Sequence, residues 1–315
     1  MGQKTLITGA FGYLGSIISS SLNKTKNNII LGISHKNDAK CPSELVDCQI
    51  KRYDLSSIVS CIELCDGVET IIHTSGMNST ECAKSPKDAL RINGMFTANL
   101  IEGALLKGVK KIIYFSTAHV YSNHLNGYID ESSSTDNTHP YATSHLAGEN
   151  QLIWAGHQNP IEIVILRLSN VYGMELVQNS NCWNLFVNDV CYQAVVNQTV
   201  YIKSQSDITR NFLPITELCR VINFIAEKKD IKNEIINIGS IRSHTLEGMA
   251  SLIVNRARLI LGITPEIIFM NKGSRELTSL DYSVNKLKGL GYLHLNNFEQ
   301  EIDNLIIQLD SRNLR

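Results

Sequence analysis

The feature that most constrains this chain is a glycine-rich turn close to its start. A short apolar run leads directly into Thr8–Gly15, and a segment with helical spacing follows it. We expect a strand, a turn and a helix whose first N–H groups bind the pyrophosphate of a dinucleotide. On this interpretation Gly9 permits the tight turn, Gly12 lets the phosphates approach the backbone, and Gly15 lets the helix pack on the strand. A purely structural turn is the alternative.

Composition excludes several classes of protein. The chain has 315 residues, 43% of them hydrophobic, and a net charge of −1, as expected for a soluble globular protein with a large core. This balance offers no basic field for nucleic acid or anionic membranes. No apolar run reaches the length of a membrane span, and a strand is expected by Thr5, so we predict a cytoplasmic protein without a signal peptide. The eight cysteines are scattered, with Cys61 and Cys65 the only close pair, so we predict reduced thiols and no metal site.

Apolar, strand-like runs alternate with longer segments of helical spacing. They lie at Thr5–Thr8, Ile29–Ile33, Thr70–His73, Lys111–Ser116 and Ile161–Leu168. This alternation is typical of an α/β fold with a doubly wound parallel sheet (Rossmann). We predict a dinucleotide-binding domain over residues 1–175, with a returning segment near 211–240 that contains a strand at Ile235–Ile238. A smaller C-terminal substrate-binding lobe is predicted over 176–315, starting in the Asn-rich stretch from Gln178 to Asn184.

Two long helices are predicted between the strands. The first runs from Pro86 to Lys107, with Ser85 as its N-cap, Asp88 reaching back to that cap, and Gly108 ending it. The second begins near Pro140 and runs to about Gly156.

Three residues with reactive side chains are predicted to meet at one edge of the sheet. Tyr141 and His145 lie four residues apart at the start of the second long helix, and therefore on one face of it. Thr117 ends a predicted central strand. Since doubly wound sheets bind ligands beyond the carboxyl ends of their strands, we place the candidate site where these residues approach the glycine turn.

Together with the glycine turn, this layout resembles the extended short-chain dehydrogenase/reductase family, in particular its nucleotide-sugar epimerases, dehydratases and reductases. The resemblance covers nearly the whole chain, and its specificity comes from the order and spacing of the motifs. They are Thr8–Gly15, Ile71–His73, Asn93-Gly94, Val109–Lys111, Phe115–Tyr121, Leu166–Gly173, Arg210–Phe212 and Ile236–Gly239.

The resemblance implies that Tyr141 is the catalytic acid/base and that Thr117 hydrogen-bonds the same substrate oxygen. The family has a lysine four residues after the tyrosine, which stabilises the phenolate and holds the nicotinamide ribose; this chain has His145 instead. A neutral imidazole can still hydrogen-bond the ribose, but it attracts a phenolate weakly. One interpretation is a working enzyme in which His145 partly replaces the lysine, which we favour because Thr117 and Tyr141 remain. A catalytically silent dinucleotide-binding protein is the second, and a helix-face histidine without a role is the third.

The end of the second strand bears on the choice of cofactor. No acidic residue lies between Gly15 and Asn37, and the sequence Ser34-His35-Lys36 offers a hydroxyl and a cation suited to a 2′-phosphate. We therefore favour NADP(H) slightly over NAD(H), with Asp38 reaching back as the alternative. The resemblance assigns Asp54 to the adenine, although a turn-initiating aspartate is equally simple. The predicted cofactor-binding residues are Gly9, Phe11, Gly12, Tyr13, Leu14, Gly15, Ser34, His35, Lys36, Asp54, Leu55, Asn93, Tyr141 and His145.

The remaining matches concern the substrate. The resemblance implies that Asn170, Asn184 and Arg210 hold the nucleotide diphosphate or the sugar; a surface ion pair is the alternative for Arg210. Dehydratases of the family follow the threonine with an acidic pair, but here Ala118-His119 occupies that place. We therefore predict hydride transfer at C4 of a nucleotide-activated sugar, as 4-keto reduction or epimerisation. His73 is predicted to be a hydrogen-bonded core histidine. The resemblance implies that the two long helices pair across a dimer axis, so we predict a homodimer, which is also the commonest type of oligomer.

Overall fold

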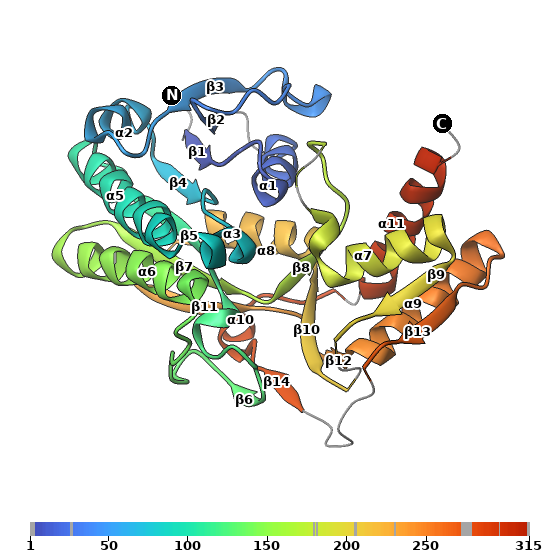
Figure 1. Ribbon diagram of the computed structural model, residues 1–315. Helices are drawn as coiled ribbons and strands as arrows, with labels where there is room; N and C mark the ends of the chain where they lie inside the picture. The colour runs from blue at the N-terminus through green and yellow to red at the C-terminus, as the bar shows by residue number, and fades with distance from the viewer. Residues whose placement is uncertain are drawn as a thin grey trace.

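The computed structural model describes residues 4–25, 28–178, 180, 182–204, 207–229, 231–271, 279–295 and 297–313. Its centre is a seven-stranded parallel sheet with the order β11-β7-β5-β4-β1-β2-β3 (Figure 1). The strands are β1 (Thr5–Thr8), β2 (Ile29–Ser34), β3 (Gln49–Tyr53), β4 (Thr70–His73), β5 (Lys111–Thr117), β7 (Glu162–Leu168) and β11 (Glu234–Ile238). The order reverses between β1 and β4, which is where doubly wound sheets bind their ligands. The predicted sheet is confirmed, and the late strand joins it by parallel pairing with β7.

Helices cover both faces of this sheet (Figure 1). One face carries α1 (Tyr13–Asn23), α8 (Ile215–Glu227) and α10 (Asn285–Gly289), and the other carries α2 (Ile58–Leu64), α5 (Phe96–Leu106) and α6 (Pro140–Gln158). Successive strand residues point to opposite faces, so Ile7 packs with the first group of helices and Leu6 with the second. Because both faces are buried, the central strands are apolar almost throughout, which is the pattern that the sequence displays.

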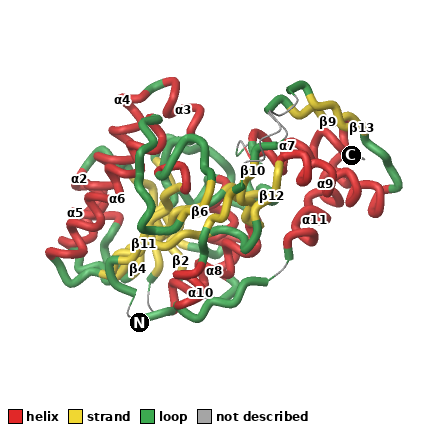
Figure 2. Tube along the Cα trace, turned by 90° about the horizontal axis from the view of Figure 1, so that it is seen from below, coloured by secondary structure: helices red, strands yellow, loops and turns green. Residues whose placement is uncertain are grey.

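A second group of elements lies beside the sheet, at the right of Figure 1 and again in Figure 2. It contains α7 (Phe186–Tyr192), α9 (Leu246–Leu261) and α11 (Phe298–Asn313), which share a separate hydrophobic core. Its strands are β8 (Asn170–Tyr172), β9 (Thr199–Ile202), β10 (Thr209–Pro214), β12 (Ser243–Thr245) and β13 (Glu266–Phe269). A further strand pair joins β6 (Gly127–Ile129) to β14 (Leu280–Tyr282). The boundary near residue 175 stays a prediction, and residues 179 and 181 of the predicted Asn-rich stretch lie outside the described residues.

Several shorter helical turns complete the chain. They are η1 (Ser43–Leu45), α3 (Ser79–Lys84), α4 (Pro86–Ala89), η2 (Leu90–Met95), η3 (Ala118–Val120), η4 (Cys182–Asn184) and η5 (Gln193–Asn197).

The first long helix is not the uninterrupted α-helix that was predicted. A π-helical stretch, η2, separates α4 from α5 and contains Asn93. The Asn93 side chain points inward, where its amide donates to the Ser144 hydroxyl (3.0 Å) and its carbonyl oxygen accepts from the Met77 N–H (2.8 Å). These two hydrogen bonds, one to a loop and one to α6, stabilise the π-helical turn. Such turns are frequent at functional sites. At the start of α4, the Ser85 hydroxyl donates to the Asp88 carboxylate (2.7 Å), and its oxygen accepts no hydrogen bond from the helix N–H groups.

A buried ion pair ties α6 to the sheet. The guanidinium of Arg167 on β7 donates two hydrogen bonds to the carboxylate of Glu149 on α6, at 3.1 and 2.7 Å. The Ser116 hydroxyl donates to the same carboxylate, and the Tyr121 ring lies 4.7 Å from the guanidinium carbon. Both charged side chains are almost fully buried. The pair therefore fixes the position of the helix that carries Tyr141 and His145.

Within the part of the chain that the structure describes, no helix is long and apolar enough to cross a membrane. The same residues contain no group of three or more His, Cys, Asp or Glu side chains placed to hold a metal ion. The cysteines carry free thiols. Burial raises the pKa of Cys61 to about 11 and that of Cys65 to about 12, so both remain protonated at neutral pH.

Candidate active site

The glycine turn joins the carboxyl end of β1 to the start of α1. Gly9 has φ +68°, a conformation that favours glycine, and its carbonyl oxygen accepts from the Gly12 N–H (2.8 Å). A Cβ on Gly15 would lie 2.1 Å from the Gly9 carbonyl oxygen, so this close approach requires glycine. A Cβ on Gly12 would meet only that oxygen, at 3.2 Å, and would otherwise fill open space at the start of α1. The turn therefore fits a pyrophosphate bound by backbone N–H groups.

Side chains around the turn hold it in place. Phe11 is buried in the core, and the Tyr13 hydroxyl donates to the Gly173 carbonyl oxygen (2.9 Å) after β8. The Tyr53 hydroxyl at the end of β3 accepts from the Gly9 N–H (3.0 Å) and also bonds the Ser75 hydroxyl. This support was not predicted, because nothing in the sequence shows that the ends of β3 and β4 reach the turn.

Polar and charged groups gather at the ends of β2 and β3. The Ser34 hydroxyl oxygen accepts from the Lys36 N–H at 3.4 Å, and His35 Nδ1 lies 4.0 Å from a carboxylate oxygen of Asp54. The other carboxylate oxygen of Asp54 accepts from the N–H (2.9 Å) and hydroxyl (2.7 Å) of Ser56, which is the turn-initiating role that the sequence left open. Arg52 donates to the Asn37 carbonyl oxygen (2.9 Å), bringing a second cation to the end of β2 that was not predicted.

Thr117 and Tyr141 meet at the carboxyl end of β5. Thr117 ends that strand, and Tyr141 lies in the first turn of α6, partly exposed. Burial raises the pKa of Tyr141 to about 12, although a hydrogen bond with Thr117 lowers it in part. The phenol is therefore protonated at neutral pH, ready to donate a proton.

His145 lies one turn further along α6. Its ring packs edge-on against the Tyr141 ring, with the ring centres 4.7 Å apart. His145 Nδ1 lies 3.0 Å from the hydroxyl of Tyr114, a residue in the middle of β5. Burial lowers the pKa of His145 to about 4, so the imidazole is neutral at pH 7. Tyr114 was not predicted; its signal in the sequence is a hydroxyl within the apolar run Ile112–Phe115, where it needs a partner.

Asn93 and His73 lie behind these residues. Asn93 joins the site through its hydrogen bond to Ser144, the neighbour of His145. His73 Nδ1 lies 2.7 Å from the Thr8 hydroxyl and Nε2 lies 3.1 Å from the Thr97 hydroxyl. His73 is thus the hydrogen-bonded core histidine that was predicted, and burial lowers its pKa to about 3.

The three predicted substrate-binding residues lie in different surroundings. Burial lowers the pKa of His119, and the charge of Arg210 on β10 lowers it further, so Arg210 lies near His119. The Asn170 amide donates to the Asn211 carbonyl oxygen (2.9 Å) and so joins β8 to β10. Asn184 is exposed in η4.

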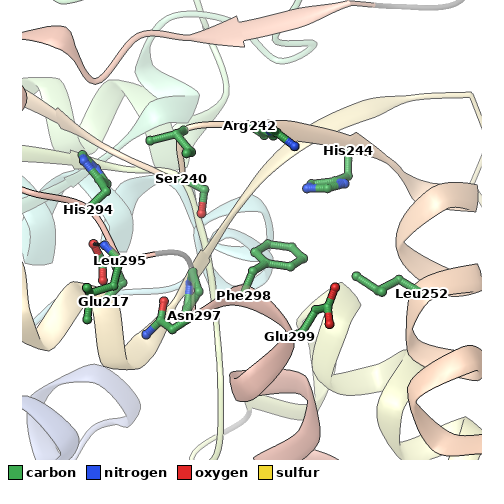
Figure 3. Close-up of a pocket in the computed structure, with 12 residues that line it drawn as sticks. Glu217, Ser240, Arg242, His244, Leu252, His294, Leu295, Asn297, Phe298 and Glu299 are labelled. Atoms are coloured by element: carbon green, nitrogen blue, oxygen red, sulfur yellow. Dashed lines mark hydrogen bonds between the residues drawn. The ribbon is translucent and has the colours of Figure 1, made fainter. Parts of the chain in front are cut away.

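A cavity of about 330 Å³ lies elsewhere, among β12, α8, α9 and the start of α11 (Figure 3). His244 and Phe298 stack against each other in its wall, with ring centres 4.9 Å apart. Its lining contains none of the residues predicted for the site. The candidate site thus depends on the edge of the main sheet and not on this cavity.

The comparisons with known proteins agree with this fold. The chain is 25% identical over 295 residues to a Methanocaldococcus jannaschii protein provisionally named UDP-glucose 4-epimerase, covering 91% of this chain and 92% of that one. A structure of UDP-glucuronic acid 4-epimerase from Bacillus cereus, in complex with UDP-glucuronic acid and NAD, superposes with a TM-score of 0.81 at 21% identity and covers 99% of this chain and 100% of that one. RMD from Pseudomonas aeruginosa, complexed with NADPH, gives the same TM-score and coverage at 18% identity.

A family model gives the assignment. The model of the NAD dependent epimerase/dehydratase family matches residues 5–239, a span that contains the glycine turn, Thr117, Tyr141 and His145. The chain therefore belongs to the NAD dependent epimerase/dehydratase family.

Proposed function

We propose that the protein is an NAD(P)-dependent enzyme that transfers a hydride at C4 of a nucleotide-activated sugar. The observation that carries this proposal is the grouping of Thr117, Tyr141 and His145 at one end of β5 and α6, on the edge of the sheet that bears the glycine turn. A bound nicotinamide supplies or accepts the hydride. The names of the relatives, which include UDP-sugar 4-epimerases, support a nucleotide sugar as the substrate.

The protonation states favour reduction of a 4-keto sugar over oxidation of a 4-hydroxyl. Burial raises the Tyr141 pKa, and the neutral His145 adds no positive charge to stabilise a phenolate. A protonated phenol can donate to the oxygen that becomes a hydroxyl during reduction, whereas oxidation requires the rare phenolate as base. Thr117 would hydrogen-bond the same oxygen. Epimerisation is the second candidate, favoured by the names of the relatives.

Substrate binding is assigned by position. We propose that Arg210 pairs with the diphosphate, because a guanidinium donates two parallel hydrogen bonds to phosphate oxygens. Asn170 and Asn184 are proposed to contact the nucleotide or the sugar. A cytoplasmic location is proposed for the enzyme.

Turnover over a panel of substrates tests the proposed function. Purified protein is incubated with NAD(H) or NADP(H) and with UDP- and dTDP-linked hexoses or their 4-keto forms, and products are identified by mass spectrometry. We expect turnover of at least one substrate. Tight dinucleotide binding without turnover of any of them would support the silent-binder alternative.

We propose NADP(H) as the preferred cofactor, bound by Ser34, His35 and Lys36 with Arg52 nearby. Ser34→Asp places a carboxylate against the 2′-phosphate, so we expect NADP(H) to weaken about tenfold more than NAD(H). Titration calorimetry with each dinucleotide measures the change, and Ser34→Ala serves as the uncharged control. A wild-type preference for NAD(H) would contradict the assignment.

We propose that the protein is a homodimer, paired through its two long helical segments. Large apolar side chains on them are exposed in the single chain: Leu90 (56%), Met95 (52%), Leu106 (64%) and Trp154 (65%). Exposed apolar side chains on two neighbouring helical segments fit an interface with a second copy of the chain. We expect light scattering at micromolar concentration to give twice the 35.1 kDa chain mass, and Trp154→Glu to give the monomer mass. Leu259→Glu, at an equally exposed position on α9, should leave the dimer intact; a monomeric wild type would refute the proposal.

A further inference from the structure

We propose that Tyr114 is a positioning residue for His145. Its hydroxyl donates to His145 Nδ1 and holds the neutral imidazole with the proton on Nε2, so that an oriented N–H donor takes the place of the lysine found in the family. The inference rests on the proposed function in one respect: it takes the free nitrogen of His145 to be the one that serves the dinucleotide.

The structure places the Tyr114 hydroxyl directly behind the imidazole. Tyr114 lies in the middle of β5 and is only 1% exposed, and its hydroxyl oxygen lies 3.0 Å from His145 Nδ1. Helix α6 makes room for the hydroxyl, because a Cβ on Gly148 would lie 2.7 Å from it. The contact thus joins Tyr114 on β5 to His145 on α6, and Gly148 leaves the space that the hydroxyl needs.

The neighbours of Tyr114 indicate which way the proton points. The Thr97 hydroxyl lies next to the phenol of Tyr114. It donates its proton to the Asn93 carbonyl oxygen (2.7 Å) and so has none to donate to Tyr114. Burial, with a contribution from the charge of Glu149, raises the pKa of Tyr114 well above its usual value, so the phenol keeps its proton and needs an acceptor. The Nδ1 atom of His145 is such an acceptor. A neutral imidazole that accepts at Nδ1 carries its hydrogen at Nε2.

The imidazole of His145 also lies close to the loop after β4. The Cε1 atom of His145, which lies between the two nitrogens, is 3.9 Å from the point that a Cβ on Gly76 would occupy, in the loop after β4. The Tyr141 ring packs against the imidazole as well. Nε2 is therefore the nitrogen left for a ligand hydroxyl. Lysine has three rotatable donors and needs no such partner, whereas an imidazole donor depends on its tautomer.

The tautomer can be measured without any substrate. With ¹⁵N-labelled histidine, NMR of the wild type at pH 7 should show His145 unprotonated at Nδ1 and protonated at Nε2; His145→Gln identifies the signals. Tyr114→Phe should shift the signals toward a mixture of tautomers. A wild-type imidazole with its proton on Nδ1 would overturn the proposal. Because this measurement needs no turnover, it can fail or succeed independently of the proposed function.

A double-mutant cycle separates positioning from a merely structural role. Tyr114→Phe should weaken dinucleotide affinity, and kcat/KM where turnover is measured, by about tenfold, the typical cost of a lost buried hydrogen bond. In a His145→Lys background the same change should cost less than about twofold, since lysine does not depend on the phenol. Tyr292→Phe, which removes a buried hydroxyl bonded to Glu217, is the matched control and should have no effect on affinity. Equal losses in both backgrounds, or no loss in either, would overturn the proposal.

Discussion

Tyr141→Phe is expected to lower kcat by about 10³-fold while dinucleotide affinity stays within about twofold of wild type. The substitution removes the only proton that the phenol can give to the sugar oxygen, but it keeps the ring that packs against His145. Because the glycine turn and the end of β2 are untouched, the cofactor should still bind. Initial rates and calorimetric titration with the dinucleotide measure the two quantities.

The pH profile of the wild type tests the protonation state of His145, whose ring packs against that of Tyr141. His145 stays neutral above its lowered pKa of about 4, so we expect no histidine titration from it between pH 5 and 8. Tyr192→Phe, on the exposed side of α7, serves as the control for loss of a phenol. Full activity in Tyr141→Phe would show that the proton comes from elsewhere and that the family mechanism does not apply.

Arg167→Met is expected to lower the free energy of unfolding by about 3–5 kcal/mol, because it leaves the buried Glu149 carboxylate without its cation. The carboxylate would keep its hydrogen bond from Ser116 but lose both bonds from the guanidinium. Since the pair anchors α6 to β7, activity should fall together with stability. Urea unfolding followed by fluorescence measures the change.

Two further variants test whether the loss of stability comes from the unpaired charge of Glu149. Arg91→Met removes an exposed arginine paired with Asp88 and should cost less than about 1 kcal/mol. The double variant Arg167→Met/Glu149→Met replaces both charges with apolar side chains and should recover much of the loss. A double variant as unstable as Arg167→Met alone would point to packing, and not to the orphaned carboxylate, as the cause.

The parts of the fold that the sequence predicts well are those with local signals. The strands of the main sheet are apolar because both faces of the sheet are buried. Gly9, Gly12 and Gly15 have the spacing of a dinucleotide-binding turn between a strand and a helix. The π-helical stretch around Asn93 has no such signal, because its cause is a hydrogen bond to Ser144, a residue far away in the sequence. In the same way, Leu287 and Tyr292 near the C-terminus pack against the core of the main sheet, which no periodicity reveals.

In the candidate site, too, the residues with a local signal were predicted and those that depend on tertiary contacts were not. Thr117, Tyr141 and His145 were predicted from a strand end, a helical spacing and a resemblance, and the structure brings them together. Tyr114 was missed because its contact with His145 depends on how α6 packs against β5, which places Gly148 over the Tyr114 hydroxyl. Asp54 was left with two roles, and its observed hydrogen bonds to Ser56 are those of the turn-initiating role.

The proposed hydride transfer to C4, with Tyr141 as the acid, can be followed with an isotope label. The protein is incubated with a 4-keto nucleotide sugar and with NADPH, or NADH, that carries deuterium at the transferable position, and the sugar is examined by mass spectrometry and NMR. We expect one deuterium at C4 of the product with wild type and almost none with Tyr141→Phe. A wild-type protein that binds both ligands, is fully folded and transfers no deuterium to the sugar would contradict the claim.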